Sequence, residues 1–123
     1  MATVLVVDDD DLVRSTLRVI LERAGHDVHE AANGQMATSF FRDKRPDVVI
    51  TDIYMPEKDG LEVVMELRRI QPDVKIIAIS GGGPNVETGL LGSAQIFGAK
   101  RTLFKPILPD VLLATVDEVL AGA

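Results

Sequence analysis

The sequence predicts a single α/β domain built on a parallel sheet, and two patterns support this prediction. Short apolar runs rich in valine and isoleucine recur at 4–7, at 48–50 and, with one lysine, at 74–79. Runs of this kind are typical of strands that are buried on both faces of a parallel sheet. Between them lie segments with apolar residues at helical spacing, so that strand and helix alternate along the chain. We therefore expect a doubly wound sheet whose right-handed crossovers place helices on both faces.

The apolar runs predict the positions of the strands, and the apolar residues at helical spacing predict the helices between them. Strands are expected at 4–7, 27–31, 48–50, 74–79 and 101–104, with a helix after each of them. The apolar residues expected to face the sheet are Val13, Leu17, Ile20, Leu21 and Ala24 in the first helix, Met36, Ala37, Phe40 and Phe41 in the second, Leu61, Val64 and Met65 in the third, Leu90, Leu91, Ala94 and Phe97 in the fourth, and Leu112, Leu113, Val116, Val119 and Leu120 in the fifth.

Local signals set the ends of some helices. Gly25 stands just after the first helix, where a left-handed backbone is common. Asn33 and Gly34 are read as a turn. Asp10 and Asp11 are expected at the start of the first helix, because carboxylates bind the free N–H groups and the positive end of the helix.

The composition limits the possible classes of function. The 123 residues fit one domain, 1–123, and 46% hydrophobic residues suffice for one core. The net charge of −6 argues against nucleic-acid binding, which needs clustered Lys and Arg. The absence of cysteine excludes disulfides, a thiol nucleophile and a cysteine-based metal site. The chain start lacks the pattern of a secretory signal, and the apolar runs are too short for a bilayer, so we expect a soluble cytoplasmic protein.

Polar residues follow four of the expected strands. The first strand ends in Asp8 and Asp9, the third in Asp52, the fourth in Ser80 and the fifth in Lys105. The carboxyl ends of parallel strands share one edge of the sheet, and ligands bind at this edge in open α/β sheets. These side chains are therefore expected to converge in one site.

The convergence of carboxylates predicts a divalent cation. Three carboxylates at close range repel one another, and a bound cation removes that repulsion. A set of oxygen ligands without histidine or cysteine favours Mg²⁺. Asp9 and Asp52 are the expected direct ligands, Asp8 is expected to act through water, and a backbone carbonyl just after Asp52 can provide a further ligand.

The same residues suit phosphoryl transfer. A carboxylate can attack phosphorus and form an acyl phosphate. Positioning and charge neutralisation of the transferred group then do most of the catalytic work. Lys105 offers a point charge for one oxygen of that group, and the Ser80 hydroxyl offers a hydrogen bond to another.

Four segments of the sequence resemble those of a known family. They read VLVVDDDD, DVVITDIYMPEKDG, IAISG and LFKPI, and their order and spacing cover essentially the whole chain. With them the sequence resembles the receiver domain of two-component response regulators, of the chemotaxis-regulator type. The resemblance implies a flavodoxin-like (βα)5 fold with the strand order 2-1-3-4-5.

The resemblance also implies roles for the matching residues. Asp52 is the aspartate that accepts a phosphoryl group from a sensor histidine kinase or a phosphotransfer protein. Asp8 and Asp9 are the acidic pair, with Asp9 as a direct Mg²⁺ ligand, and Tyr54 contributes its backbone carbonyl to the metal. Lys105 matches the family lysine, and the peptide bond that follows it is expected to be cis.

Two residues match the positions of the family's switch. Ser80 stands at the position of the switch Ser or Thr. Thr102 stands where many receivers carry Tyr or Phe, so its coupling to Ser80 is expected to differ from theirs. The glycines at 81–83 make the next loop a candidate for ordering on phosphorylation.

Other functions are weighed against this one. A phosphatase of the haloacid-dehalogenase type also forms an aspartyl phosphate, but it requires a second Asp where Tyr54 stands. A flavodoxin-like mononucleotide binder needs a phosphate loop after the first strand, where four aspartates would repel phosphate. A receiver-like module that accepts no phosphate is the remaining alternative, and the intact acidic set argues against it.

The expected protein is therefore a signalling domain with at most slow self-dephosphorylation, rather than an enzyme. Its expected partners are a kinase or phosphotransfer protein and an unknown downstream protein or output domain. No nucleic acid or membrane partner is expected, and a phosphorylation-dependent dimer is left open.

Overall fold

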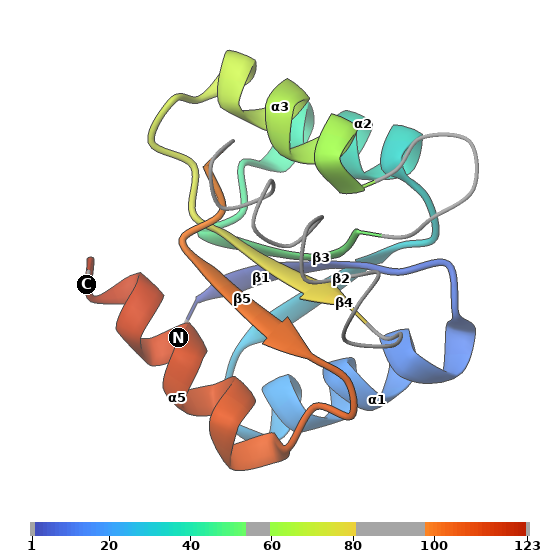
Figure 1. Cartoon of the computed structure of the whole chain (residues 1–123), viewed down its shortest axis with the longest axis vertical. Helices are drawn as coiled ribbons and strands as arrows, with labels where there is room; N and C mark the ends of the chain where they lie inside the picture. The colour runs from blue at the N-terminus through green and yellow to red at the C-terminus, as the bar shows by residue number, and fades with distance from the viewer. Residues whose placement is uncertain (1, 54–59, 81–97, 123) are drawn as a thin grey trace.

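The computed structural model describes residues 2–53, 60–80 and 98–122 and shows a five-stranded parallel sheet in the order β2-β1-β3-β4-β5 (Figure 1). The strands are β1 (Thr3–Val7), β2 (Asp27–Ala31), β3 (Val48–Asp52), β4 (Ile76–Ser80) and β5 (Arg101–Phe104). The helices of the described part are α1 (Asp11–Arg23), α2 (Gly34–Lys44), α3 (Gly60–Ile70) and α5 (Pro109–Leu120). The predicted fold class, parallel pairing and strand order are confirmed.

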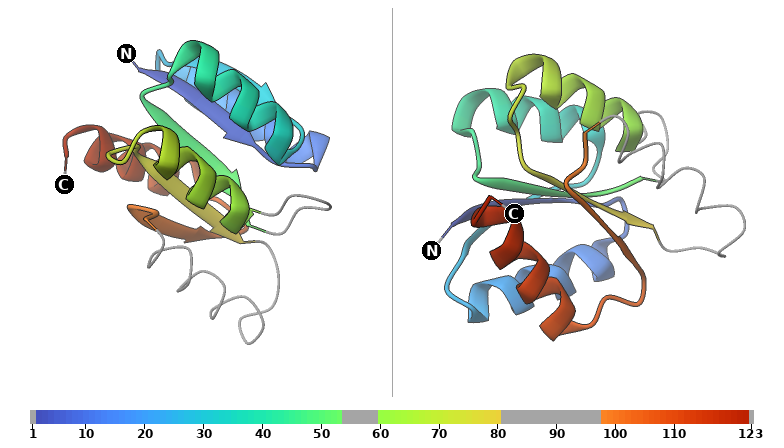
Figure 2. Two further views of the ribbon diagram at one scale, coloured as in Figure 1. Left: turned by 90° about the horizontal axis from the view of Figure 1, so that it is seen from above. Right: turned by 60° about the vertical axis from the view of Figure 1, so that its left-hand side comes forward.

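The helices lie in pairs on the two faces of the sheet. α2 and α3 cover one face, and α1 and α5 cover the other (Figures 1 and 2). The step from β1 to β2 runs toward one margin of the sheet, whereas the steps from β2 to β3 and from β3 to β4 run toward the other. A constant right-handed crossover therefore places α1 on the face opposite to α2 and α3.

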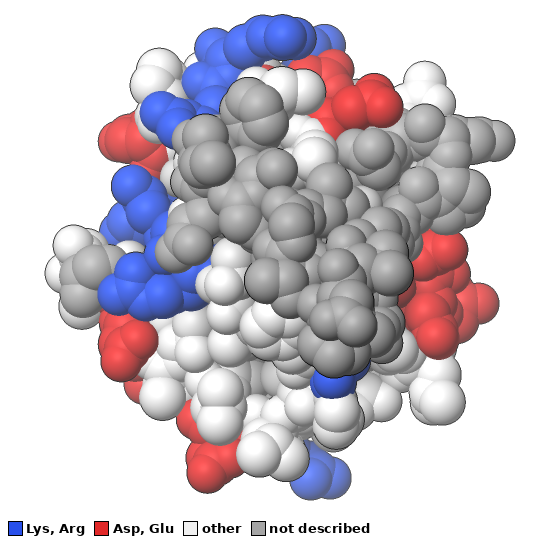
Figure 3. Space-filling view, in the orientation of Figure 1, with Lys and Arg blue, Asp and Glu red and all other residues white. Residues whose placement is uncertain are grey.

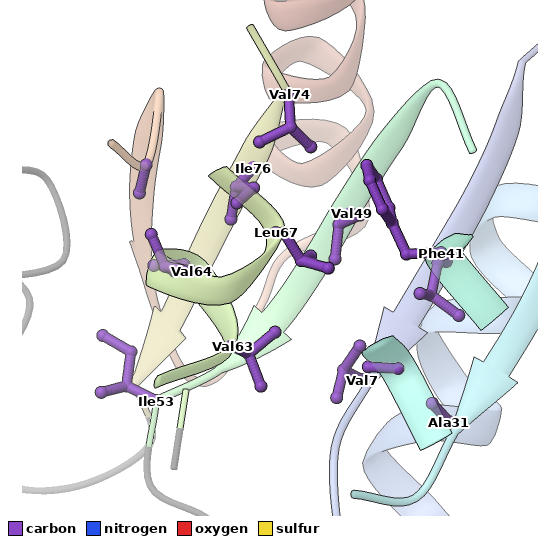
Figure 4. Packing of buried hydrophobic residues seen from close by; sticks show 14 residues of the cluster. Val7, Ala31, Phe41, Val49, Ile53, Val63, Val64, Leu67, Val74 and Ile76 are labelled. Carbon is purple, nitrogen blue, oxygen red and sulfur yellow. The ribbon is translucent and has the colours of Figure 1, made fainter. Parts of the chain in front are cut away.

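The central strands send alternate residues into two separate cores. Between the sheet and the α2–α3 pair, Val49 and Ile76 pack with Phe41 and Leu67 (Figure 4). The core on the α1–α5 side includes Val4, Val6, Leu17, Leu21, Ile50, Ile77, Ile79, Leu112 and Val116. Complete burial of one such side chain contributes about 1.5–3 kcal/mol, so the two cores hold the ends of the central strands in fixed positions.

The expected signals at both ends of α1 are confirmed. The Asp10 side chain accepts hydrogen bonds from the N–H groups of Leu12 at 2.9 Å and Val13 at 3.2 Å and so caps the helix. Gly25 follows the helix with a φ of 94°, a conformation that favours glycine. The cap fixes the start of α1 directly after the acidic pair at the end of β1.

Several local boundaries differ from the sequence prediction: β1 begins one residue earlier, at Thr3, and β3 extends two residues further, to Asp52. Asn33 and Gly34 are not a separate turn, because the Asn33 side chain accepts the N–H of Met36 at 2.8 Å and caps α2, which begins at Gly34. Asn is favoured in turns and in helix caps alike, so the sequence did not separate the two. β4 begins at Ile76, two residues later than predicted, and it extends through Ser80.

The buried faces of the helices also differ in detail from the prediction. Met36 is 49% exposed rather than buried, and Ala24 is exposed because it is the C-cap of α1. In α3, Val63 and Leu67 are fully buried together with the predicted Val64. A helical phase read from a few apolar residues is uncertain by about one position, which accounts for these differences.

Some predictions concern residues outside the described ranges. They are Tyr54, the loop at 81–84 and the fourth helix around 90–97, and they stay predictions. In the described ranges, no helix combines the length and apolar character needed to cross a membrane.

Gly98 marks a tight passage between α3 and the start of β5. Its φ is 124°, which residues with a side chain rarely adopt. A Cβ added at this glycine would collide with Cδ and Nη1 of Arg68. The backbone conformation therefore favours glycine here, and the exposed Arg68 side chain would have to shift to admit a Cβ.

The change Gly98→Ala is expected to lower the free energy of unfolding by about 1–3 kcal/mol, the usual cost of a strained backbone conformation. Urea unfolding followed by circular dichroism measures this change. Gly122→Ala serves for comparison: its φ of 85° also favours glycine, but it lies just after α5 near the end of the described residues, where the backbone can relax, so a smaller change is expected. Equal unfolding midpoints for Gly98→Ala and the wild type would contradict the prediction.

Candidate functional site

The three carboxylates predicted from the strand ends lie together in the structure. Asp8 follows β1, Asp52 ends β3, and Asp9 lies in the connection from β1 to α1. One carboxylate oxygen of each residue lies within 4.8 Å of those of the other two. β1 and β3 are neighbours, and the chain leaves them toward opposite margins of the sheet, which is the point at which ligands bind in open α/β sheets.

Lys105 reaches this cluster from the end of β5. Its Nζ lies 3.2 Å from Asp8 Oδ2 and 3.2 Å from Asp52 Oδ2. Its backbone N–H donates to the carbonyl of Ser80 at 2.7 Å, and the peptide bond between Lys105 and Pro106 is cis, as predicted. Burial lowers the pKa of Lys105, but the carboxylates of Asp52 and Asp8 outweigh this effect and hold the pKa above its ordinary value. The ammonium is therefore charged at neutral pH.

The burial of the site leaves two polar atoms unsatisfied. Asp8 is 1% exposed and Asp52 is 5% exposed, which is unusual for carboxylates. In the part of the chain that the structure describes, Asp8 Oδ2 and Ser80 Oγ are buried without a hydrogen bond, although Asp8 Oδ2 lies near the Lys105 charge. A buried hydroxyl without a hydrogen-bond partner, such as that of Ser80, costs roughly 1–3 kcal/mol. These atoms therefore mark a place where a ligand can bind.

The geometry fits a divalent cation. The donors are all oxygen atoms, one of them a buried carboxylate oxygen without a hydrogen bond, and the Asp9 side chain is exposed to solvent. Mg²⁺ binds to one or two carboxylates and keeps other positions for water and phosphate oxygens. The acidic cluster can therefore hold a metal ion, as the strand ends predicted.

The groups that hold Asp8 in place were not predicted from the sequence. Its N–H donates to the carbonyl of Ala31 at 3.2 Å, and its Oδ1 accepts the N–H of Asp10 at 2.9 Å. Its carbonyl accepts a hydrogen bond from Nη1 of Arg14 at 2.7 Å, and Nε of Arg14 donates to Glu30 at 2.8 Å. The backbone and one carboxylate oxygen of Asp8 are thus fixed from three sides.

Arg14, Arg18 and Glu30 form a charged network between α1 and β2. Glu30 binds Arg14 and also Nη1 of Arg18, which lies 2.7 Å from Glu30 Oε2. The hydrogen bond from Arg18 and the weaker contribution of Arg14 hold the pKa of Glu30 below its ordinary value, against the opposing effect of burial. The sequence shows only the spacing of Asp11 and Arg14 on one helix. The contacts of Arg14 with β2 and with the end of β1 depend on the fold, so no sequence signal revealed them.

The predicted switch residues lie on neighbouring strands. Ser80 is fully buried at the end of β4 and is paired in register with Phe104 of β5. Thr102 is half-buried in β5 and is paired with Ala78. Tyr54 lies outside the described residues, so the role of its carbonyl as a metal ligand stays a prediction.

Charges are unevenly distributed over the face shown in Figure 3. Acidic side chains gather beside the connection from β1 to α1, whereas Lys and Arg gather on the opposite side, over the C-terminal end of α3. Asp9 and Asp10 in that connection and Asp11 at the start of α1 are all exposed. A concentration of negative charge beside the carboxyl ends of β1 and β3 attracts cations to this edge of the sheet.

Comparison with known proteins defines the class of this chain. The family model for the response regulator receiver domain matches residues 4–117. The chain therefore belongs to the response regulator receiver domain family, whose members act in two-component systems.

Individual relatives are similar over almost the whole chain. The chemotaxis protein CheY of Thermotoga maritima is 35% identical over 117 residues, which cover 94% of this chain and 95% of that protein. The sensor kinase CckA of Brucella abortus is 38% identical over 121 residues, which cover 97% of this chain and 12% of the kinase. A receiver domain protein of Clostridium thermocellum has a crystal structure that matches with a TM-score of 0.92 at 27% identity, over 98% of this chain and 95% of that one. The chain thus resembles both a protein of its own length and a segment of a much longer one.

Mg²⁺ is expected to raise the midpoint of thermal unfolding of this chain. A ligand that binds only the folded state stabilises it by about 2.7 kcal/mol at a concentration 100 times its dissociation constant. Asp9→Ala should abolish most of this increase, and the fold should tolerate the change because the side chain is exposed. Calorimetric scans with and without Mg²⁺ measure the effect. Asp43→Ala, at an exposed position in α2, is the control, and an equal increase in both variants would contradict the assignment.

Glu30→Gln is expected to destabilise the chain at neutral pH but not in acid. The pKa of Glu30 is held below its ordinary value of 4.5 in the folded state. Its contribution to stability is therefore present above that value and is lost as the pH falls through the lower folded pKa. Urea unfolding of both proteins over a range of pH should show a difference at pH 7 that shrinks below pH 4.5. A difference that is independent of pH would rule out this interpretation.

Proposed function

We propose that this chain is a phosphoryl-accepting switch in which Asp52 receives the phosphoryl group of a phosphohistidine donor. The position of Asp52 is the observation that carries the proposal. Its carboxylate is buried at the end of β3, within 4.8 Å of oxygens of Asp8 and Asp9 and 3.2 Å from the Lys105 ammonium. A carboxylate beside a metal site and a fixed cation suits a nucleophile that must carry a charged acyl phosphate. Membership of the receiver family supports the same chemistry.

In the proposed reaction, one carboxylate oxygen of Asp52 attacks the phosphorus of the donor. A bond forms between this oxygen and phosphorus while the bond between phosphorus and the histidine nitrogen breaks. The electron pair of the broken bond stays on that nitrogen, and the ring leaves as neutral imidazole because its other nitrogen carries a proton. Attack of water on the phosphorus later releases inorganic phosphate and restores the carboxylate, which gives slow self-dephosphorylation.

The residues around Asp52 are proposed to neutralise the transferred group. Asp8, Asp9 and Asp52 would hold Mg²⁺, which supplies positive charge to a phosphoryl oxygen when it is bound. The Lys105 ammonium, now shared by two carboxylates, would pair with a second oxygen. The buried hydroxyl of Ser80, which has no hydrogen bond to a described residue, would donate to a third.

The proposal extends to the output of the switch. A Ser80 hydroxyl that turns toward the phosphoryl group would change the packing at the end of β4, and Thr102 on the neighbouring β5 belongs to the surface that would report this change. We propose that residues 1–123 act as one receiver domain in the cytoplasm, with a histidine kinase or phosphotransfer protein as donor. A downstream protein, an output domain or a second copy of the chain would read the phosphorylated state.

The direct test is treatment of the chain with acetyl phosphate and Mg²⁺, followed by intact mass spectrometry. The wild type is expected to gain one phosphoryl group, because a small phosphodonor replaces the phosphohistidine. The gain should disappear in Asp52→Asn and after removal of Mg²⁺ with EDTA.

Asp43→Asn is the control for this experiment, because it removes an exposed carboxylate far from the site and should be phosphorylated like the wild type. A gain that persists in Asp52→Asn would locate the acceptor elsewhere. No gain with any phosphodonor would favour an interaction module that accepts no phosphate.

A further inference from the structure

Arg14 connects three segments around the acidic pair. It lies in the second turn of α1, and its side chain is 14% exposed. Its Nη1 donates to the carbonyl of Asp8 at 2.7 Å, its Nε donates to Oε1 of Glu30 at 2.8 Å, and its Nη2 pairs with Asp11. The guanidinium therefore joins the end of β1, the edge strand β2 and the first turn of α1.

The carbonyl of Asp8 belongs to the peptide unit that joins Asp8 to Asp9. A peptide unit is planar, so fixing its oxygen fixes the direction in which the chain continues to Asp9. The Asp9 carboxylate is exposed and makes no hydrogen bond or ion pair with another described residue. Its position in the cluster is therefore set by its backbone, and Arg14 holds that backbone.

Charge neutralisation alone does not explain Arg14. Its positive charge is already matched by Glu30 and Asp11, both of which pair with it directly. A planar guanidinium directs its N–H groups along fixed lines, which an ammonium group does not. Arg14 links Glu30 of β2 to the Asp8 carbonyl, and Glu30 is itself held in place by an ion pair with Arg18.

We propose that Arg14 is a positioning residue for the metal: by binding the Asp8 carbonyl from the Glu30 side, it holds Asp8 and Asp9 in the geometry that Mg²⁺ requires. This inference rests on the proposed Mg²⁺ site and adds to it a residue that does not touch the ion. Partners that orient metal ligands in this way typically contribute about 10–100-fold to metal affinity.

The test measures the Mg²⁺ dissociation constant of the whole chain by isothermal titration calorimetry, without a phosphodonor. Arg14→Gln is expected to weaken Mg²⁺ binding about 10-fold. Arg14→Lys should also weaken it, because one ammonium cannot reach both the Asp8 carbonyl and Glu30 with the geometry of the guanidinium. Arg23→Gln, at an exposed position in the last turn of the same helix, is the matched control and should keep the affinity of the wild type.

A second readout separates positioning from a general loss of stability. When the rate of phosphorylation by acetyl phosphate is measured against Mg²⁺ concentration, Arg14→Gln should need more Mg²⁺ for half-maximal rate. Its rate at saturating Mg²⁺ should equal that of the wild type. A general destabilisation of α1 would lower the rate at saturating Mg²⁺ as well, so it would not give a higher Mg²⁺ requirement with an unchanged maximal rate.

The outcomes distinguish this inference from the proposed function. Wild-type Mg²⁺ affinity in Arg14→Gln would overturn the inference alone, and so would wild-type affinity in Arg14→Lys, because charge would then suffice. If Arg14→Gln does not fold, Arg14→Lys carries the test, since it keeps the charge. A wild-type chain that binds no Mg²⁺ would overturn both the inference and the proposed site.

Discussion

Repulsion among the carboxylates of Asp8, Asp9 and Asp52 is the constraint around which this protein is organised. The carboxylate oxygens of these residues lie within 4.8 Å of one another, and the rest of the fold must hold them there against their mutual repulsion. Two apolar cores provide this stabilisation. They fix β1 and β3 side by side, so that both strands end at the same edge of the sheet. Folding free energy from apolar burial is thereby used to hold a site that is electrostatically unfavourable without a cation.

Lys105 relieves only part of this repulsion. One ammonium lies 3.2 Å from both Asp8 and Asp52, and it stands against two buried negative charges. The carboxylate of Asp9 extends toward solvent, where a metal can arrive. The negative charge of the site and the buried Oδ2 of Asp8, which accepts no hydrogen bond from a described residue, both favour binding of a positive ion. The hydrogen bonds around Asp8 hold its backbone carbonyl and one of its carboxylate oxygens in place.

Much of this organisation could be predicted from the sequence, because parallel topology turns the ends of strands into neighbours. Asp8, Asp52, Ser80 and Lys105 were located in this way, and the resemblance to receivers supplied the strand order. The bonds of Arg14 could not be predicted, since they join α1 to β2 and to the end of β1 through side-chain directions that only the fold determines. The prediction that Met36 faces the sheet was wrong for a simpler reason, because neighbouring apolar residues permit more than one helical phase.

The burial of the strands differs across the sheet. Every residue of β3 and β4 is buried, whereas none of the residues of β5 is fully buried and Phe104 is half exposed. The centre of the sheet is therefore more deeply buried than the margin formed by β5. Asp52 is the last residue of the fully buried strand β3, whereas Lys105 directly follows the less buried strand β5. Among the described strands β5 has the fewest buried residues, so a shift of β5 in response to a rearrangement of charge between these two residues would disturb the least buried packing.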